Sequence, residues 1–421
     1  AAAAMCIGMG SFSDPIDVPG LAHILEHMLF MGSAEFPDEN EYDSYLSKHG
    51  GSSNAYTEHE RTCYYFQVKD EFLKETLKRY SQFFISPLVK PKALEREILA
   101  VDSEFYKDLQ NDAHRLAQLR YEQFSCLVGL TVADLEAFIP ELLSQLYVEG
   151  LCRGNLSEEE ALNISDIFSL NFPVQPLPLE LRHKDRLLCL TPGAYLVRDA
   201  SVKNKLEKTS VLKLYFQIEP DTGTEPTRTS ALIYLFSQIV AEPFFDQLRT
   251  KEQLGYQVSC GGSTMRRILG YSFCVQSSEY NPMYLHRRVN KFIGSLEELL
   301  EGLDEESFEK YRSGLIAGKV VKFPSQSCEA SYLWSQISSK RYCFKMWEKE
   351  AEEVKTISKS DVIDWYNTYP KPTSQKCRRL AIHLWGSNTN IMEEEASMKS
   401  AKTIEDIRNF KMSSEFYPSI C

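Results

Sequence analysis

The chain has 421 residues, 43% of them hydrophobic, which is enough to bury the cores of two or three domains of ordinary size. Its 59 acidic residues outnumber its 47 basic residues, and the net charge of −12 argues against nucleic acid or an anionic membrane surface as a partner. No apolar run approaches the roughly 18 to 20 residues of a membrane span, and the 11 cysteines include no C-x-x-C pair.

The first predicted element is a buried strand over residues 2–8, and a helix over 21–31 follows Pro19 and Gly20. Because the chain begins at Ala1 inside this apolar run, we expect a segment to precede it. The elements that follow are a helix, two strands rich in aromatic and β-branched residues, and two helices, over residues 41–48, 53–57, 62–68, 71–85 and 91–119.

A similar order of elements recurs later in the chain. Strand, helix, two strands and helix are predicted over residues 211–219, 227–248, 256–259, 269–276 and 284–300. This pattern indicates a degenerate internal repeat. The counterpart of the 21–31 helix, around residues 230–240, contains no His. Only the first repeat can therefore bind a metal through this helix.

The helix over residues 21–31 carries a candidate metal site. His23 and His27 are four residues apart and Glu26 lies between them, so a helix places all three on one face. Catalytic zinc sites use three protein ligands and leave a fourth position for water, whose pKa the metal lowers towards about 7. Glu26 is then placed to act as the general base. A helix whose His and Glu only face solvent is the alternative.

The third ligand has to come from elsewhere in the chain. The helix predicted over residues 91–119 is rich in carboxylates, among them Glu95, Glu97, Asp102 and Glu104. Glu97 and Glu104 are two helical turns apart and share a face. One of them can bind the metal while the other supports a histidine. A solvated acidic helix is again the alternative.

Several motifs together resemble the pitrilysin family of inverted-HxxEH metallopeptidases, and within it the nardilysin and insulin-degrading-enzyme branch. They stand in the family's order: GLAHILEHMLFMGS at residues 20–33, FPDENEY at 36–42, KHGGSSNAYT at 48–57 and AVDSE at 100–104. The resemblance implies one zinc ion per chain with His23, His27 and Glu104 as ligands. Glu26 would be the base and Glu97 the supporting acid.

The resemblance also implies where a substrate binds. Asn54 and Ala55 would lie on an edge strand to which an extended peptide adds by β-augmentation. The segment LRTKEQLGY at residues 248–256 resembles one that the second half of these enzymes contributes to catalysis. Arg249 and Tyr256 would there steady the substrate and the tetrahedral oxyanion. Without the family, the first segment is a sheet edge and the second a helix end.

Members of this family are more than twice as long as this chain, with four related domains. The implied fold is α+β, with pitrilysin-like units that each pack an antiparallel sheet against helices. We predict an incomplete zinc-binding domain over residues 1–120, a remnant of a middle domain over 121–175, and an inactive peptidase-like domain over 176–421. As a hypothesis, residues 135–170 complete the first domain.

We therefore predict a zinc metalloendopeptidase that hydrolyses short polypeptides, with Arg249 and Tyr256 assisting if the two units face each other. A shortened product that binds zinc or peptides without cleaving them is the alternative. The partner is a peptide or small-protein substrate, with a homo-oligomer or a full-length relative as further candidates. The expected compartment is the cytoplasm, with organelle import through a preceding segment as the alternative.

Overall fold

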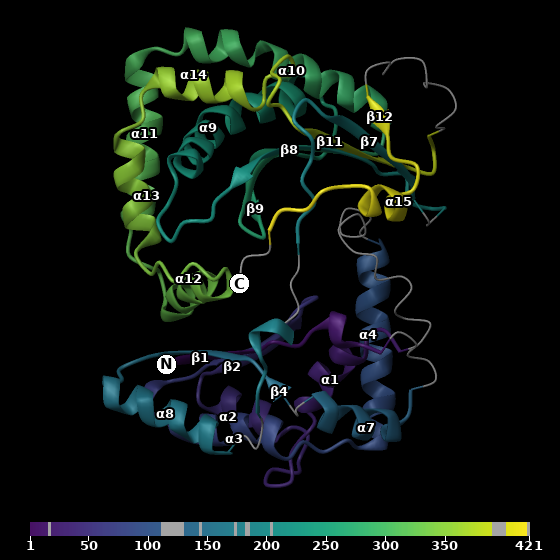
Figure 1. The fold of residues 1–421 in the computed structure, drawn as a ribbon, viewed down its shortest axis with the longest axis vertical. Coiled ribbons are helices and arrows are strands. Elements are labelled where there is room, and N and C mark those ends of the chain that lie inside the picture. The colour runs from purple at the N-terminus through teal and green to yellow at the C-terminus, as the bar shows by residue number, and fades with distance from the viewer. Residues whose placement is uncertain are drawn as a thin grey trace. The chain divides into compact units, whose positions relative to one another are not determined.

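The computed structural model describes residues 1–15, 18–110, 130–142, 145–171, 175–181, 186–202, 205–389 and 401–418 (Figure 1). The chain divides into two compact units: the first consists of Ala1–Asp185 and Phe323–Ser338, the second of Arg186–Lys322 and Ser339–Cys421. Each unit packs a sheet against helices, which confirms the predicted α+β class. The change of domain predicted near residue 120 lies outside the described residues.

The first unit is built on a four-stranded antiparallel sheet in the order β2-β3-β1-β5. Its strands are β1 (Ala2–Ile7), β2 (Ser52–Thr57), β3 (Thr62–Gln67) and β5 (Val148–Arg153). β2 is an edge strand, and β5 pairs with the opposite side of β1, with Met5 across from Gly150. β5, which lies within residues 135–170, therefore forms the edge of this sheet opposite β2.

Helices cover one face of this sheet. Every second residue along each strand points to this face. Met5, Tyr64 and Phe66 are examples, and they form one hydrophobic core with Ile24 and Leu25 of the first helix. The helices are α1 (Leu21–Leu29), α2 (Glu41–Lys48), α3 (Leu73–Ile85), α4 (Pro91–Gln110), α7 (Val132–Leu142) and α8 (Glu158–Asn171). A short parallel pair, β4 (Gln145–Leu146) with β6 (Gln175–Pro176), completes the unit.

The other face of the same sheet is covered by a helix from far along the chain. α12 (Gln326–Ser338) packs on β1 and β5. Trp334 and Ile337 of this helix bury Cys6 and Cys63, which face each other across β1 and β3. Arg61 donates to the carbonyl oxygen of Ser338 at 2.6 Å. The chain thus leaves the second unit after Lys322 to complete the first, which the sequence did not indicate.

The second unit contains a six-stranded sheet in the order β12-β7-β11-β8-β10-β9, with α9, α10 and α14 against it (Figure 1). The strands are β7 (Tyr195–Ser201), β8 (Ser210–Pro220), β9 (Gln257–Met265), β10 (Ile268–Ser277), β11 (Arg379–Trp385) and β12 (Lys402–Thr403). The helices are α9 (Arg228–Phe245), α10 (Pro282–Gly302), α11 (Glu305–Val320), α13 (Met346–Lys355), α14 (Lys359–Thr368) and α15 (Ile407–Met412).

The predicted antiparallel sheet is mixed in this unit, because two of its strand pairs are parallel. β11 pairs parallel with β7, and β12 also pairs parallel with β7. Parallel neighbours need a long connection, and the helices between β7 and β11 supply one.

Among the described residues, no helix is both long and apolar enough to cross a bilayer.

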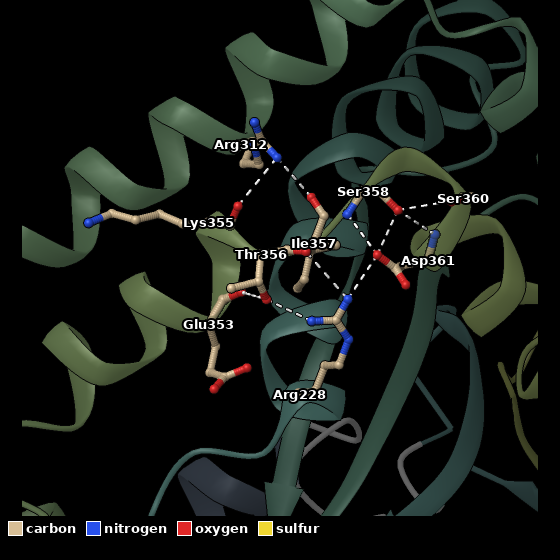
Figure 2. Close-up of polar contacts among 9 residues, drawn as sticks. All are labelled: Arg228, Arg312, Glu353, Lys355, Thr356, Ile357, Ser358, Ser360 and Asp361. Carbon is tan, nitrogen blue, oxygen red and sulfur yellow. Dashed lines mark hydrogen bonds and ion pairs between the residues drawn. The ribbon is translucent and has the colours of Figure 1, made fainter.

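Two arginines hold the turn between α13 and α14 (Figure 2). Arg228 donates to the Thr356 hydroxyl at 2.7 Å and to the Asp361 carboxylate at 2.8 Å. Arg312 donates to the carbonyl oxygen of Ile357 at 3.0 Å. Ser358 and Asp361 form a capping box at the start of α14. The Ser358 hydroxyl and backbone N–H, and then Arg228, hold the pKa of Asp361 below its usual range.

Substituting Arg228→Met should lower the free energy of unfolding by about 1 kcal/mol, because two charge-assisted hydrogen bonds are lost at a half-exposed site. Urea unfolding followed by circular dichroism measures the change. Lys310→Met is the matched control, since its ion pair with Glu306 is largely exposed and should contribute little. Equal stability of the two variants would contradict a role for Arg228 in holding the turn.

A network of polar side chains around two buried histidines crosses the sheet of the second unit. Tyr195 Oη lies 3.0 Å from His286 Nε2, and His286 Nδ1 lies 2.8 Å from His383 Nε2. His383 Nδ1 in turn lies 3.0 Å from Asp199 Oδ1, which also accepts from Trp385 Nε1 at 2.7 Å. Burial, and then the positive charges of His383 and Arg379, hold the pKa of His286 well below its usual value.

The buried His286 in this network predicts that the protein loses stability in mild acid. A His whose pKa is lowered on folding takes up its proton only in the unfolded state, so stability falls as the pH drops below about 6.5. Between pH 7.5 and 5.5, His286 should account for on the order of 1 kcal/mol of the loss. The measurement is the free energy of unfolding in urea at both pH values, for the unmodified protein and for His286→Gln. The same pH dependence in both proteins would refute the prediction.

Candidate metal centre

Contacts at its N-terminus fix the position of α1, the helix that carries the two histidines. Gly20 precedes α1 with φ of 99°, a conformation that favours glycine. The Asp14 carboxylate accepts hydrogen bonds from the backbone N–H groups of Gly20 and Ala22, both at 2.7 Å. Burial raises the pKa of Asp14 to about 6, although these two bonds act in the opposite direction. Ile24 and Leu25 are buried, which leaves the histidine face of α1 towards α4.

His23, His27 and Glu104 converge on one point. Their ligand atoms all lie within 4.8 Å of one another, and Glu104 Oε2 is 3.8 Å from the Nε2 atom of each histidine. Ligand atoms about 2.0 to 2.2 Å from a tetrahedral zinc ion lie roughly 3.3 to 3.6 Å apart. The two imidazoles and one carboxylate therefore fit zinc after a small contraction, and a fourth position is left for water.

Glu97 contacts the Nδ1 side of the His27 ring. Its Oε2 atom lies 3.0 Å from His27 Nδ1, and both side chains are largely buried. A carboxylate at Nδ1 favours the tautomer that leaves Nε2 free to bind a metal. Nε2 is the atom of His27 that faces Glu104. Of the two carboxylates, Glu104 thus lies beside the Nε2 atoms of both histidines, and Glu97 lies beside Nδ1 of His27.

Glu26 faces the sheet and is 7% exposed. The Thr57 hydroxyl donates a hydrogen bond to Glu26 Oε2 at 2.6 Å. Thr57 belongs to the motif at residues 48–57, but its contact with Glu26 depends on the register of β2 and was not predicted. Burial, and then the charge of Glu26, raise the pKa of the Tyr64 phenol well above its usual value.

Asn54 and Ala55 lie on the edge strand β2. The backbone N–H of Ala55 is held by the side-chain oxygen of Asn54 at 2.9 Å. Since β2 pairs through its other side with β3, this N–H points to the open edge. A strand that added here would exchange that local bond for a ladder bond.

Arg249 and Tyr256 belong to the second unit. Arg249 lies in a π-helical turn, Asp246–Lys251, that follows α9, and its guanidinium is 5.7 Å from the Tyr256 ring centre. Tyr256 is 84% exposed just before β9. The half-buried Arg249 and the exposed Tyr256 are thus two neighbouring hydrogen-bond donors.

Comparisons with known proteins identify relatives of this chain. Residues 1–125 match the insulinase family (peptidase family M16), and residues 235–334 match the family described as PQQ synthase PqqF-like, C-terminal lobe domain 4. A nardilysin-like protein of Arabidopsis thaliana is 52% identical over 300 residues, which are 71% of this chain and 29% of that protein. Human insulin-degrading enzyme is 50% identical over 281 residues, 64% of this chain and 26% of the enzyme.

Solved structures show the same fold at low identity. Pitrilysin superposes with a TM-score of 0.78 at 16% identity, over 100% of this chain and 44% of pitrilysin. A protease from Helicobacter pylori superposes with a TM-score of 0.67 at 14% identity, over 91% of this chain and 94% of that protein. The chain thus spans less than a third of the nardilysin-like protein and of insulin-degrading enzyme.

Proposed function

This chain is related to the insulinase (M16) peptidases, and on that premise we propose that it is a zinc-dependent metalloendopeptidase acting on short polypeptides. The observation that carries the proposal is the convergence of His23, His27 and Glu104 beside the buried carboxylate of Glu26. We also propose a cytoplasmic location, because the 11 scattered cysteines suggest no disulfide framework.

The chemistry divides between the metal and the protein. When bound by His23, His27 and Glu104, zinc supplies Lewis-acid polarisation and lowers the pKa of water. Glu26 accepts the proton of the attacking water and donates it to the leaving amine. Thr57 holds one oxygen of Glu26 in place, so the other keeps a constant direction through both transfers. Glu97 holds His27 in the tautomer that the metal needs.

The substrate is proposed to bind as an extended strand on β2. Backbone hydrogen bonds at Asn54 and Ala55 bind any sequence in this mode, and side chains supply selectivity. The end of β2 carries Thr57, which contacts Glu26, so a strand added to this edge runs past the general base. Arg249 and Tyr256 of the second unit are proposed to donate hydrogen bonds to the tetrahedral oxyanion.

The test is turnover of a quenched fluorescent peptide library by the purified chain. Activity that is lost on chelation and restored by one equivalent of zinc would support the proposal. A folded, zinc-loaded chain without turnover would overturn it and favour the alternative of a non-catalytic protein that binds zinc or peptides.

A further inference from the structure

The outer face of the first sheet contains a cavity that the metal chemistry does not use. Its volume is about 460 Å³. Residues of β1, β2, β3 and β5 line it on one side, and residues of α12 line it on the other. The lining residues are Ala2, Ala3, Ala4, Ser52, Ser53, Asn54, Tyr56, Tyr65, Phe66, Gln67, Leu151, Ser327, Ala330, Ser331 and Trp334. All of them are uncharged, and three are aromatic residues whose side chains carry a polar atom.

The alternation of side chains along β2 connects this cavity with the substrate strand. Ser53 contacts Asp43 of α2, and Thr57 contacts Glu26 of α1. One set of β2 side chains therefore faces these two helices. The other set faces α12: Tyr56 accepts from Trp334 Nε1 at 3.2 Å, and Asn54 lines the cavity. Successive side chains of a strand point to opposite faces.

α12 covers only part of its face of the sheet. The cross-strand pair Tyr56 and Cys63 lies under this helix. The next pairs along the two strands are Asn54 with Tyr65 and Ser52 with Gln67. All four of these side chains are exposed, and all four line the cavity. The cavity therefore extends from α12 to the open edge of the sheet.

We propose that this cavity is a subsite that selects an uncharged aromatic or aliphatic side chain of the bound peptide; this proposal rests on the proposed peptidase function. A peptide strand added to β2 places alternate side chains on the α12 face, and the residue opposite Asn54 enters the cavity. Asn54 and Thr57 are three positions apart, so this residue lies about two to four positions from the scissile bond.

The chemistry of the lining sets the preference. The rings of Tyr65 and Trp334 can pack against an apolar side chain of the peptide. Ala330 and Ser331 have small side chains, which leave room for it in the cavity. A Lys or Asp side chain in the cavity would lose hydration without meeting an opposite charge. Filling a hydrophobic pocket of this kind discriminates between substrates by roughly 10- to 200-fold in kcat/KM.

The test is a scan of peptides that carry Phe, Gly, Asp or Lys at each position within four residues of the scissile bond. Phe should be favoured over Asp and Lys by about 10-fold or more in kcat/KM at one position or at two alternate positions. Ser331→Asp, on the exposed side of α12, should raise kcat/KM several-fold for the Lys peptide at that position only. Ser335→Asp, one turn further along and outside the cavity, is the matched control.

The outcomes separate this proposal from the peptidase proposal. Hydrolysis with no positional preference, or with equal effects of the two aspartate variants, would overturn the subsite and leave the peptidase intact. If no peptide is hydrolysed, the same peptides are titrated against the metal-free chain. Tighter binding of the Phe peptide, reversed towards Lys by Ser331→Asp, would support the subsite although the peptidase proposal had failed. The absence of binding would overturn both.

Discussion

Replacing Glu26 with Gln should lower kcat for peptide hydrolysis by about 10²- to 10⁴-fold while zinc binding stays unchanged. Gln keeps the size of the side chain and can still accept the hydrogen bond from Thr57, but it cannot take a proton from water. The measurement is turnover of the fluorescent peptide at saturating substrate, together with the zinc content of the same sample.

The control for this prediction is Glu95→Gln, which removes the same charge from an exposed position on α4. That variant should keep the activity of the unmodified chain. If Glu26→Gln retained full turnover, a contaminating protease would be the source of the activity, or another group would be the base. Loss of zinc in the variant would instead assign Glu26 a role in holding the ligands.

Replacing Glu97 with Ala should weaken zinc binding by about 10- to 100-fold, because His27 loses the carboxylate that orients its ring. Replacing Glu104 with Ala should weaken it further, since a ligand atom itself is removed. Competition with a chelating dye of known affinity measures both constants.

Glu95→Ala is the matched control for these two variants, because it lies on the same helix and is exposed. Its zinc affinity should equal that of the unmodified chain. Two results would contradict the assignment of roles: an affinity of Glu97→Ala equal to that of the control, or a weaker affinity for Glu97→Ala than for Glu104→Ala.

The α+β class and the metal motif could be predicted because they depend on local spacing. Residues three and four apart on a helix share a face wherever the helix lies, so His23, Glu26 and His27 were identified without any tertiary information. The carboxylates of α4 could be narrowed to Glu97 and Glu104 by the same reasoning, and the family resemblance then assigned their roles. In the structure, Glu97 lies beside Nδ1 of His27, and Glu104 lies beside both histidines; their roles stay a prediction.

The remaining features depend on contacts between residues far apart in the chain. The register of β2 brings Thr57 to Glu26, and α12 reaches the first sheet from more than three hundred residues along the chain. The parallel pairing of β7 with β11 and the buried contact of His286 with His383 are of the same kind. Each element could have formed with its local pattern satisfied by another neighbour.

The sequence by itself therefore determined which elements form, which helix carries the histidines and which chemistry they suit. The tertiary structure decided which carboxylate reaches which imidazole, what holds the general base and what covers the second face of the sheet. The physical reason is that helix and strand periodicity record only which side of an element is apolar. The partner that buries this side is selected by packing across the whole unit, which no local window of sequence contains.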